Sequence, residues 1–232
     1  MERIILIETS TALCSVALAE GGDIVAYRES SAPKAHASLT AVFIDEMLKE
    51  RGLTLADCDA VCVSMGPGSY TGLRVGVSTA KGLCFGSGKP LIAVGTLDTL
   101  VAQAATVIPS EVEGSPAQFI IPMVDARRME VYTAVFESGC QVTETAPAII
   151  EQTSFAEYLE QGPCLFIGDG AGKCADVIKH PNARFCQCWP KASAMLAPAM
   201  KAYKEKRFED VAYFEPFYLK EFVATVSKKK LF

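Results

Sequence analysis

The stretch SMGPGSYTGLRVGVSTAKG, residues 64–82, joins a predicted strand to a predicted helix. The apolar run 60–65 at its start is typical of a buried strand, and Ser69 is a favoured N-cap residue for a helix over about 69–86. A strand that leads through a glycine-rich turn into a helix is the basic unit of an α/β fold. The question is whether these glycines bind a phosphate group or let another surface approach closely.

The glycines do not have the spacing of the two common phosphate loops. A P-loop needs G-x-x-x-x-G-K-[ST], but Gly68 and Gly72 are one residue too close and no Lys-Ser/Thr pair follows. The fingerprint G-x-G-x-x-G would need a third glycine where Thr71 stands. Since the N–H groups of a helix N-terminus attract anions, two interpretations stay open: a tight turn, or an anion site at Ser69.

Small residues also recur within the predicted helix. Gly72, Gly76 and Ala80 are four residues apart, and an interior glycine costs about 0.5–1 kcal/mol relative to alanine. Such a stripe lets another backbone approach closely. It either packs on the protein's own sheet or contacts a helix of another chain, in which case Tyr70, Leu73 and Val77 would be the larger contact residues.

The rest of the chain repeats one plan twice. In the first half, apolar runs predict strands at 3–9, 14–20, 24–30, 60–65 and 91–95, and helical spacing predicts helices over 34–50, 69–86 and 96–107. In the second half, strands are predicted at 119–126, 130–136, 147–151, 164–168 and 184–188, with helices near 154–161, from 172, and at about 192–206. The polar stretch 108–118 separates the halves. We therefore expect an α/β fold with a duplicated mixed β-sheet flanked by helices, a lobe over 1–107, and a lobe over 108–232 whose helix at 192–206 packs back on the first.

Composition limits the function classes. The net charge is −5, from 22 basic and 27 acidic residues, which is not the footprint of a direct nucleic-acid binder. The nine cysteines are mostly in apolar segments, where a thiol packs as a small hydrophobe. Cys186 and Cys188 form the closest pair, and a metal or redox role for them stays open. With no signal-peptide pattern and no apolar run of about 20 residues, we expect a cytoplasmic protein without a membrane span.

Groups for catalysis are few. His36 and His180 are the two histidines, no H-E-x-x-H or G-x-S-x-G motif occurs, and we expect no metal and no cofactor. A second glycine cluster, 168–172, follows a predicted strand, and its Asp169 is either a helix cap or a ligand-binding group. The candidate anion- or nucleotide-binding residues are Thr9, Ser10, Gly68, Ser69 and Gly170.

Five segments together resemble the TsaB (YeaZ) family. They are IETSTALCSVAL (7–18), GPGSYTGLRVGVSTAKGL (66–83), PLIAVGTLDTL (90–100), VDARRMEVYTAVF (124–136) and FIGDGAG (166–172). The resemblance implies the two-lobed actin/Hsp70/sugar-kinase (ASKHA) architecture. It also implies a role in making N6-threonylcarbamoyladenosine, the modified base beside the anticodon of tRNAs that read ANN codons. In that pathway a TsaD transferase acts with TsaB and with TsaE, an ATPase.

One departure from the catalytic relative suggests an accessory role. TsaD has a metal-binding H-x-x-x-H where this chain has Thr96 and Leu100. The resemblance therefore implies a non-catalytic subunit that binds TsaD through the helices at 34–50 and 69–86, forms a homodimer when alone, and meets tRNA only through the complex. The expected partner-binding residues are Phe43, Met47, Tyr70, Gly72, Leu73, Gly76 and Val77. The alternatives are a nucleotide-binding ATPase or kinase of the same fold, and a metallopeptidase.

Overall fold

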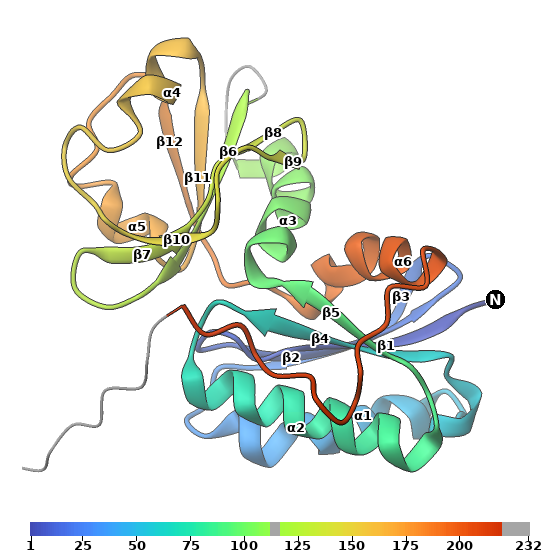
Figure 1. Ribbon diagram of the computed structural model, residues 1–232. Helices are drawn as coiled ribbons and strands as arrows, with labels where there is room; N and C mark the ends of the chain where they lie inside the picture. Colours follow the sequence, from blue (N-terminus) through green and yellow to red (C-terminus); the bar gives the residue numbers. More distant parts are fainter. Residues whose placement is uncertain (112–116, 220–232) are drawn as a thin grey trace, which may run out of the picture.

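The computed structural model describes residues 1–111 and 117–219, and its two lobes are each built on one β-sheet (Figure 1). The second predicted lobe, 108–232, thus includes residues 112–116 and 220–232, which lie outside the described ranges. Helix α3 (Thr96–Glu111) runs between the two sheets and contacts strands of both.

The sheet of the first lobe has the strand order β3-β2-β1-β4-β5. Its first three strands form an antiparallel meander, whereas β4 and β5 run parallel to β1, so the sheet is mixed. The strands are β1 (Arg3–Glu8), β2 (Cys14–Glu20), β3 (Asp23–Ser30), β4 (Ala60–Gly66) and β5 (Leu91–Gly95).

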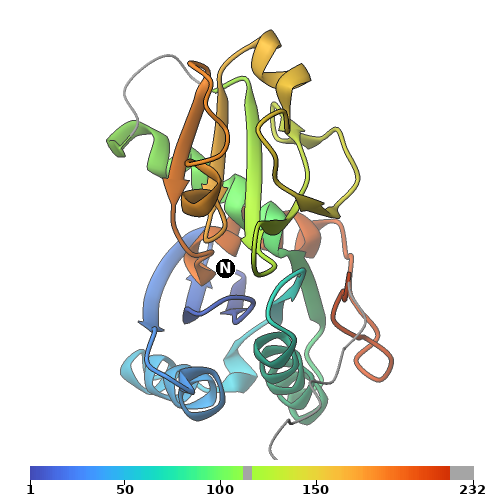
Figure 2. The same cartoon turned by 90° about the vertical axis from the view of Figure 1, so that its left-hand side faces the viewer.

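Helices cover both faces of this sheet. The face turned away from the second lobe carries α1 (Ala35–Glu50) and α2 (Tyr70–Ser87), side by side in Figures 1 and 2. The short helix η1 (Leu55–Asp57) lies between α1 and β4 in the chain. The opposite face carries η2 (Ala192–Met195) and α6 (Leu196–Lys204), whose alanines pack on β1 and β2. The helix predicted at 192–206 therefore packs against the first lobe.

The sheet of the second lobe follows the same plan, with the order β10-β7-β6-β11-β12. Strands β6, β11 and β12 are parallel, while β7 and β10 are antiparallel additions. The elements are β6 (Phe119–Asp125), β7 (Glu130–Thr133), β8 (Phe136–Glu137), β9 (Cys140–Gln141), β10 (Ala146–Ile149), α4 (Ala156–Gln161), β11 (Cys164–Gly168), α5 (Ala171–Cys174) and β12 (Ala183–Gln187). This repetition confirms the predicted duplicated α/β plan.

The strand predicted at 130–136 is two strands in the structure. Strand β7 pairs with β6 near its end, and β8 pairs with β6 near its start in the same register, so the pairing is interrupted at Ala134 and Val135 and then resumes. Both of these residues are buried, which is why the apolar pattern continues through the break.

The segment after α6 returns along the first lobe. Glu209 donates its N–H to Leu91 O, Phe214 is buried in the core beneath α1 and α2, and Phe217 donates its N–H to Met65 O at 2.8 Å. In Figure 1 this red segment runs across β5 and past α2. Its described part ends beside the space between the lobes. No helix within residues 1–111 and 117–219 is long and apolar enough to span a membrane.

Candidate functional site

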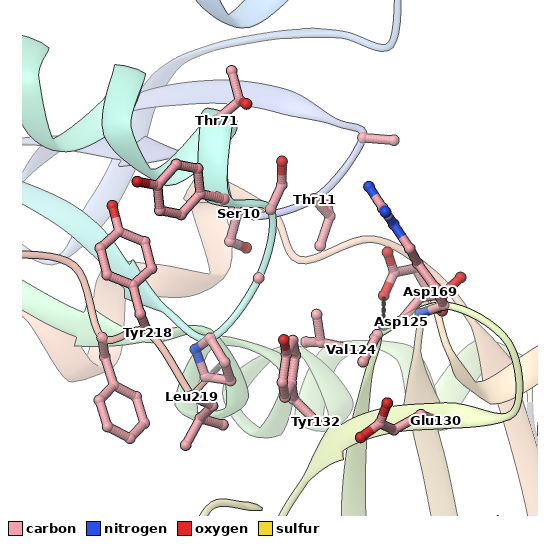
Figure 3. A pocket seen from close by; sticks show the side chains of 18 of the residues that line it. Ser10, Thr11, Thr71, Val124, Asp125, Glu130, Tyr132, Asp169, Tyr218 and Leu219 are labelled. Carbon is pink, nitrogen blue, oxygen red and sulfur yellow. Dashed lines mark hydrogen bonds between the residues drawn. The ribbon is translucent and has the colours of Figure 1, made fainter. Parts of the chain in front are cut away.

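A cleft of about 930 Å³ lies between the two lobes. Figure 3 shows Ser10, Thr11 and Thr71 on one side, and Asp125, Glu130, Tyr132 and Asp169 on the other. The first wall is built by the β1–β2 turn and the start of α2, and the second by the turn after β6 and the end of β11. The end of the returning segment, Phe217 to Leu219, also lines the cleft.

The β1–β2 turn is held in place by hydrogen bonds from three elements. Ser10 donates its N–H to Glu8 Oε1 and accepts the N–H of Ser69 on its carbonyl oxygen, both at 2.6 Å. The Nε2 atom of His36 lies 2.9 Å from Thr11 O. The turn is therefore fixed against the N-termini of α1 and α2.

The small-residue stripe of α2 faces this same turn. A Cβ atom at Gly68 would overlap Ser10 O, one at Gly72 would overlap Thr9 O, and one at Gly76 would overlap Thr9 Oγ1. Of the two interpretations of the stripe, the structure supports packing within this chain. The glycines let the polar turn lie directly on the helix.

Four successive side chains in this region have buried polar atoms without hydrogen-bond partners among the described residues. These atoms are Glu8 Oε2, Thr9 Oγ1, Ser10 Oγ and Thr11 Oγ1. Burial raises the pKa of Glu8 to about 7, against the hydrogen bond from the Ser10 N–H that lowers it, and the charge of Asp169 adds to the increase. A carboxyl with this pKa carries a proton for much of its time near neutral pH.

The opposite wall carries carboxylates held by specific partners. Asp125 forms an ion pair with Lys173 at 2.6 Å, and Asp169 Oδ1 accepts the N–H of Asp125 at 2.9 Å. Burial raises the pKa of Asp169 to about 6, and the negative charge of Asp125 contributes. The side chain of Asp169 therefore binds backbone of β6 and does not cap α5.

A strained turn at the end of β6 brings two cations to the mouth of the cleft. Arg127 and Arg128 both have positive φ angles, 72° and 50°, and both side chains are exposed. Hydrogen bonds hold this conformation: Arg127 donates its N–H to Asp125 Oδ1, and Lys173 Nζ donates to Arg128 O, both at 2.7 Å.

The predicted anion-binding residues fall into two groups. Ser10, Gly68 and Ser69 come together on the first wall of the cleft. Thr9 instead faces α2, and Gly170 lies against Val131 and Met123 behind the second wall. The sequence did not indicate Arg127, Arg128 or Tyr132 as part of this site, because only the fold brings them opposite Ser10.

Most of the expected partner-binding residues are core residues, which corrects the sequence-based expectation of a surface. The side chains of Met47, Leu73 and Val77 are buried under α1 and α2, and Gly72 and Gly76 are covered by the β1–β2 turn. They are buried because the apolar stripe of each helix faces the sheet.

Two of the expected contact residues are at the surface in part. Phe43 is half-buried at the edge of the core. The rings of Tyr70 and Tyr218 are in tilted contact with their centroids 4.9 Å apart, and the guanidinium of Arg74 lies 4.2 Å from the centre of the Tyr70 ring.

The outer faces of α1 and α2 carry features that the sequence did not single out. Phe85 is 87% exposed and Val42 is 44% exposed. Added Cβ atoms at Gly82 and Gly86 would meet open space. Small residues four positions apart thus occur on an exposed face of α2 as well as on its buried face. The spacing alone could not predict which of these faces the protein buries.

Thr96 and Leu100, the positions for which the resemblance implied a lost metal site, lie in the core. The Thr96 hydroxyl is 3.0 Å from Ser64 Oγ, and Leu100 packs between the lobes. Among the described residues, no group of three or more histidines, cysteines or carboxylates is arranged to hold a metal ion.

The pair Cys186 and Cys188 is largely inaccessible to solvent. Cys186 is buried and Cys188 is half-buried, and burial with Cys186 nearby raises the pKa of Cys188 to about 12. A thiol with so high a pKa is a poor nucleophile at neutral pH.

Comparisons with known proteins point to the proteins of tRNA threonylcarbamoyladenosine biosynthesis. The family model described as TsaD, tRNA N6-adenosine threonylcarbamoyltransferase, matches residues 29–228. The tRNA threonylcarbamoyladenosine biosynthesis protein TsaB of Escherichia coli is 32% identical over 96% of both chains. That of Haemophilus influenzae is 31% identical over 98% of this chain and 96% of its own.

Solved structures show the same fold. YeaZ from Pseudomonas aeruginosa superimposes with a TM-score of 0.79 at 26% identity, over 94% of this chain and 100% of that one. A further structure from that organism, described as similar to peptidase YeaZ, gives a TM-score of 0.82 at 25% identity, over 95% and 100% of the two chains. The fold is thus the two-lobed ASKHA type, and the chain belongs to the TsaB family of tRNA threonylcarbamoyladenosine biosynthesis proteins.

Proposed function

We propose that this chain is a cytoplasmic, non-catalytic subunit that binds a TsaD-like transferase and, with a TsaE-like ATPase, supports threonylcarbamoyl transfer to tRNAs that read ANN codons. The tRNA meets this subunit only through the complex. When the transferase is absent, the same surface pairs two copies of the chain. Membership of a family named for this pathway supports the proposal.

The observation that carries the docking surface is the exposure of Phe85 on α2. This phenylalanine is 87% exposed. Its helix, α2, lies with α1 on the face of the first lobe that is turned away from the second lobe (Figure 2). Large exposed aromatic side chains are characteristic anchors of protein interfaces. Gly82, one turn earlier, leaves open space beside it, which would let a partner helix approach.

The proposed surface therefore consists of Val42, Phe43, Arg74, Gly82 and Phe85. This surface lies on α1 and α2, the two helices expected from the sequence. Its exposed residues take the place of the buried Met47, Leu73 and Val77. Docking here leaves the cleft of this chain uncovered.

The non-catalytic role is supported by Thr96 and Leu100. Both side chains are fully buried, so neither position can present a metal ligand to a substrate in the cleft. A leucine side chain has no atom that binds a metal ion.

The docking surface can be tested with Phe85→Ser and Gly82→Leu. Both positions are exposed, so the isolated subunit is expected to stay folded, while affinity for the transferase falls at least about tenfold. Isothermal titration calorimetry with the purified transferase measures this change. The serine removes the anchor, and the leucine blocks close approach of the partner.

Ile149→Ser is the matched control. Ile149 is 70% exposed on β10, at the far edge of the second lobe, so its loss should leave the affinity unchanged. Unchanged binding by both α2 variants would contradict the docking surface.

A further inference from the structure

The two lobes of this chain are joined by two crossings of the backbone. The first runs through α3, which lies between the two sheets (Figure 1), and the second is the segment 188–191 between β12 and η2. Among the described elements, no strand of the first sheet packs extensively on a strand of the second. The angle between the lobes, and with it the width of the cleft whose walls they form, therefore depends on these crossings.

Helix α3 packs on the second lobe and is hydrogen-bonded to the first. Leu97, Leu100 and Ala104 lie in one apolar cluster with residues of β6 and β11. Its first residue, Thr96, has its hydroxyl 3.0 Å from Ser64 Oγ on β4, and both side chains are fully buried. Most of the helix thus belongs with the second sheet, and its N-terminus is the point at which the first crossing meets the first lobe.

The second crossing passes from one lobe to the other at Pro190. On the second-lobe side, Cys188 donates its N–H to Gly168 O, at the end of β11, at 3.4 Å. On the first-lobe side, Ala192 donates its N–H to Ser15 Oγ on β2 at 2.9 Å. The backbone is therefore tied to one lobe just before Pro190 and to the other just after it.

The side chain of Gln103, on α3, is hydrogen-bonded to the backbone on both sides of Pro190. Its Nε2 donates to Trp189 O and its Oε1 accepts the N–H of Lys191, both at 3.0 Å. Because a proline has no N–H, the carboxamide pairs with the acceptor and the donor that flank it. Gln103 is 5% exposed, and breaking these bonds in a buried position would leave polar groups unpaired, which is unfavourable.

We propose that Gln103 is a latch that fixes the angle between the two lobes. It ties the second crossing to α3, and α3 packs on the second sheet. The lobes therefore cannot rotate about Thr96 and Pro190 without breaking its bonds to Trp189 and Lys191. With the latch intact the two lobes move as one body and the cleft keeps one width. This inference does not rest on the proposed docking function, because it concerns contacts within the chain alone.

The angle between the lobes can be measured on the full chain by NMR, from residual dipolar couplings of the backbone amides. For the wild type, one alignment tensor is expected to fit residues 3–95 and 119–187 together. Gln103→Met keeps a side chain of similar length and removes both hydrogen bonds. In this variant the two lobes are expected to need different tensors.

Hydrogen exchange of the Lys191 amide shows whether the latch is broken. It should become at least about tenfold faster in Gln103→Met, because this N–H loses its buried acceptor. Gln103→Glu still accepts the N–H of Lys191 but at neutral pH cannot donate to Trp189 O, so the exchange should change much less.

The matched control is Gln161→Leu. The side chain of Gln161 is exposed on α4 and donates to Glu157 O of its own helix. Its loss should leave the alignment tensor and the exchange of the Lys191 amide as they are in the wild type.

Three results would overturn the proposal. The lobes of the wild type could already need separate tensors, in which case they are not latched. Gln103→Met could keep the angle of the wild type although its Lys191 amide exchanges fast, in which case other contacts set the angle. The Lys191 amide could also stay protected in Gln103→Met, in which case Gln103 does not hold it.

Discussion

At the scale of single residues, Glu8 is the most unusual side chain of the first lobe. It is fully buried at the end of β1, and one of its oxygens fixes the turn that carries Ser10. Its pKa of about 7 in the folded chain lies above the ordinary value of 4.5. The folded state therefore keeps a proton that the unfolded state releases between these two values.

This difference predicts a pH dependence of stability. The contribution of Glu8 is fully present below pH 4.5 and is lost as the pH rises through about 7. Within that window it changes the free energy of unfolding by on the order of 1.4 kcal/mol per pH unit. Glu8→Gln is neutral at every pH and should remove this decline, which urea denaturation at pH values across the window measures.

Glu46→Gln, on the exposed face of α1, is the control for a change of net charge. It should keep the decline seen in the wild type. If Glu8→Gln keeps it as well, Glu8 is not the group responsible.

At the scale of elements, α2 has two faces with glycines in different roles. Gly72→Ala would push a Cβ into Thr9 O and should destabilise the chain by about 1–3 kcal/mol, as overpacking does. Gly82→Ala meets open space and should stabilise it by about 0.5–1 kcal/mol through helix propensity. Thermal unfolding of the two variants measures both changes, and equal effects would show that the two glycines are not in different environments.

The same helix shows what sequence could and could not predict. Ser69 as N-cap and the apolar periodicity located α2 to within one residue at each end, because both signals are local. The small-residue spacing correctly indicated a close neighbour. It could not identify that neighbour as the β1–β2 turn, which comes some sixty positions earlier and is brought there by the pairing of β1 with β4.

At the scale of the whole molecule, the duplicated plan was predictable and the cleft was not. Buried strands gave continuous apolar runs, so β1, β4 and β11 could be recognised one by one. Ser10 and Arg127 come from different lobes and line the same cleft. No pattern within a short stretch of sequence can predict that two such distant residues share a cleft. The returning segment after α6 was missed because it is largely without regular secondary structure, so it has no periodicity to detect.

We propose above that this chain supports a transferase without catalysing the reaction. The most direct measurement is tRNA modification by the purified TsaD-like transferase and TsaE-like ATPase, with and without this chain. We expect N6-threonylcarbamoyladenosine to form when the chain is added and to be strongly reduced without it or with Phe85→Ser in its place. Equal modification without the chain, or modification by the chain alone, would contradict the account.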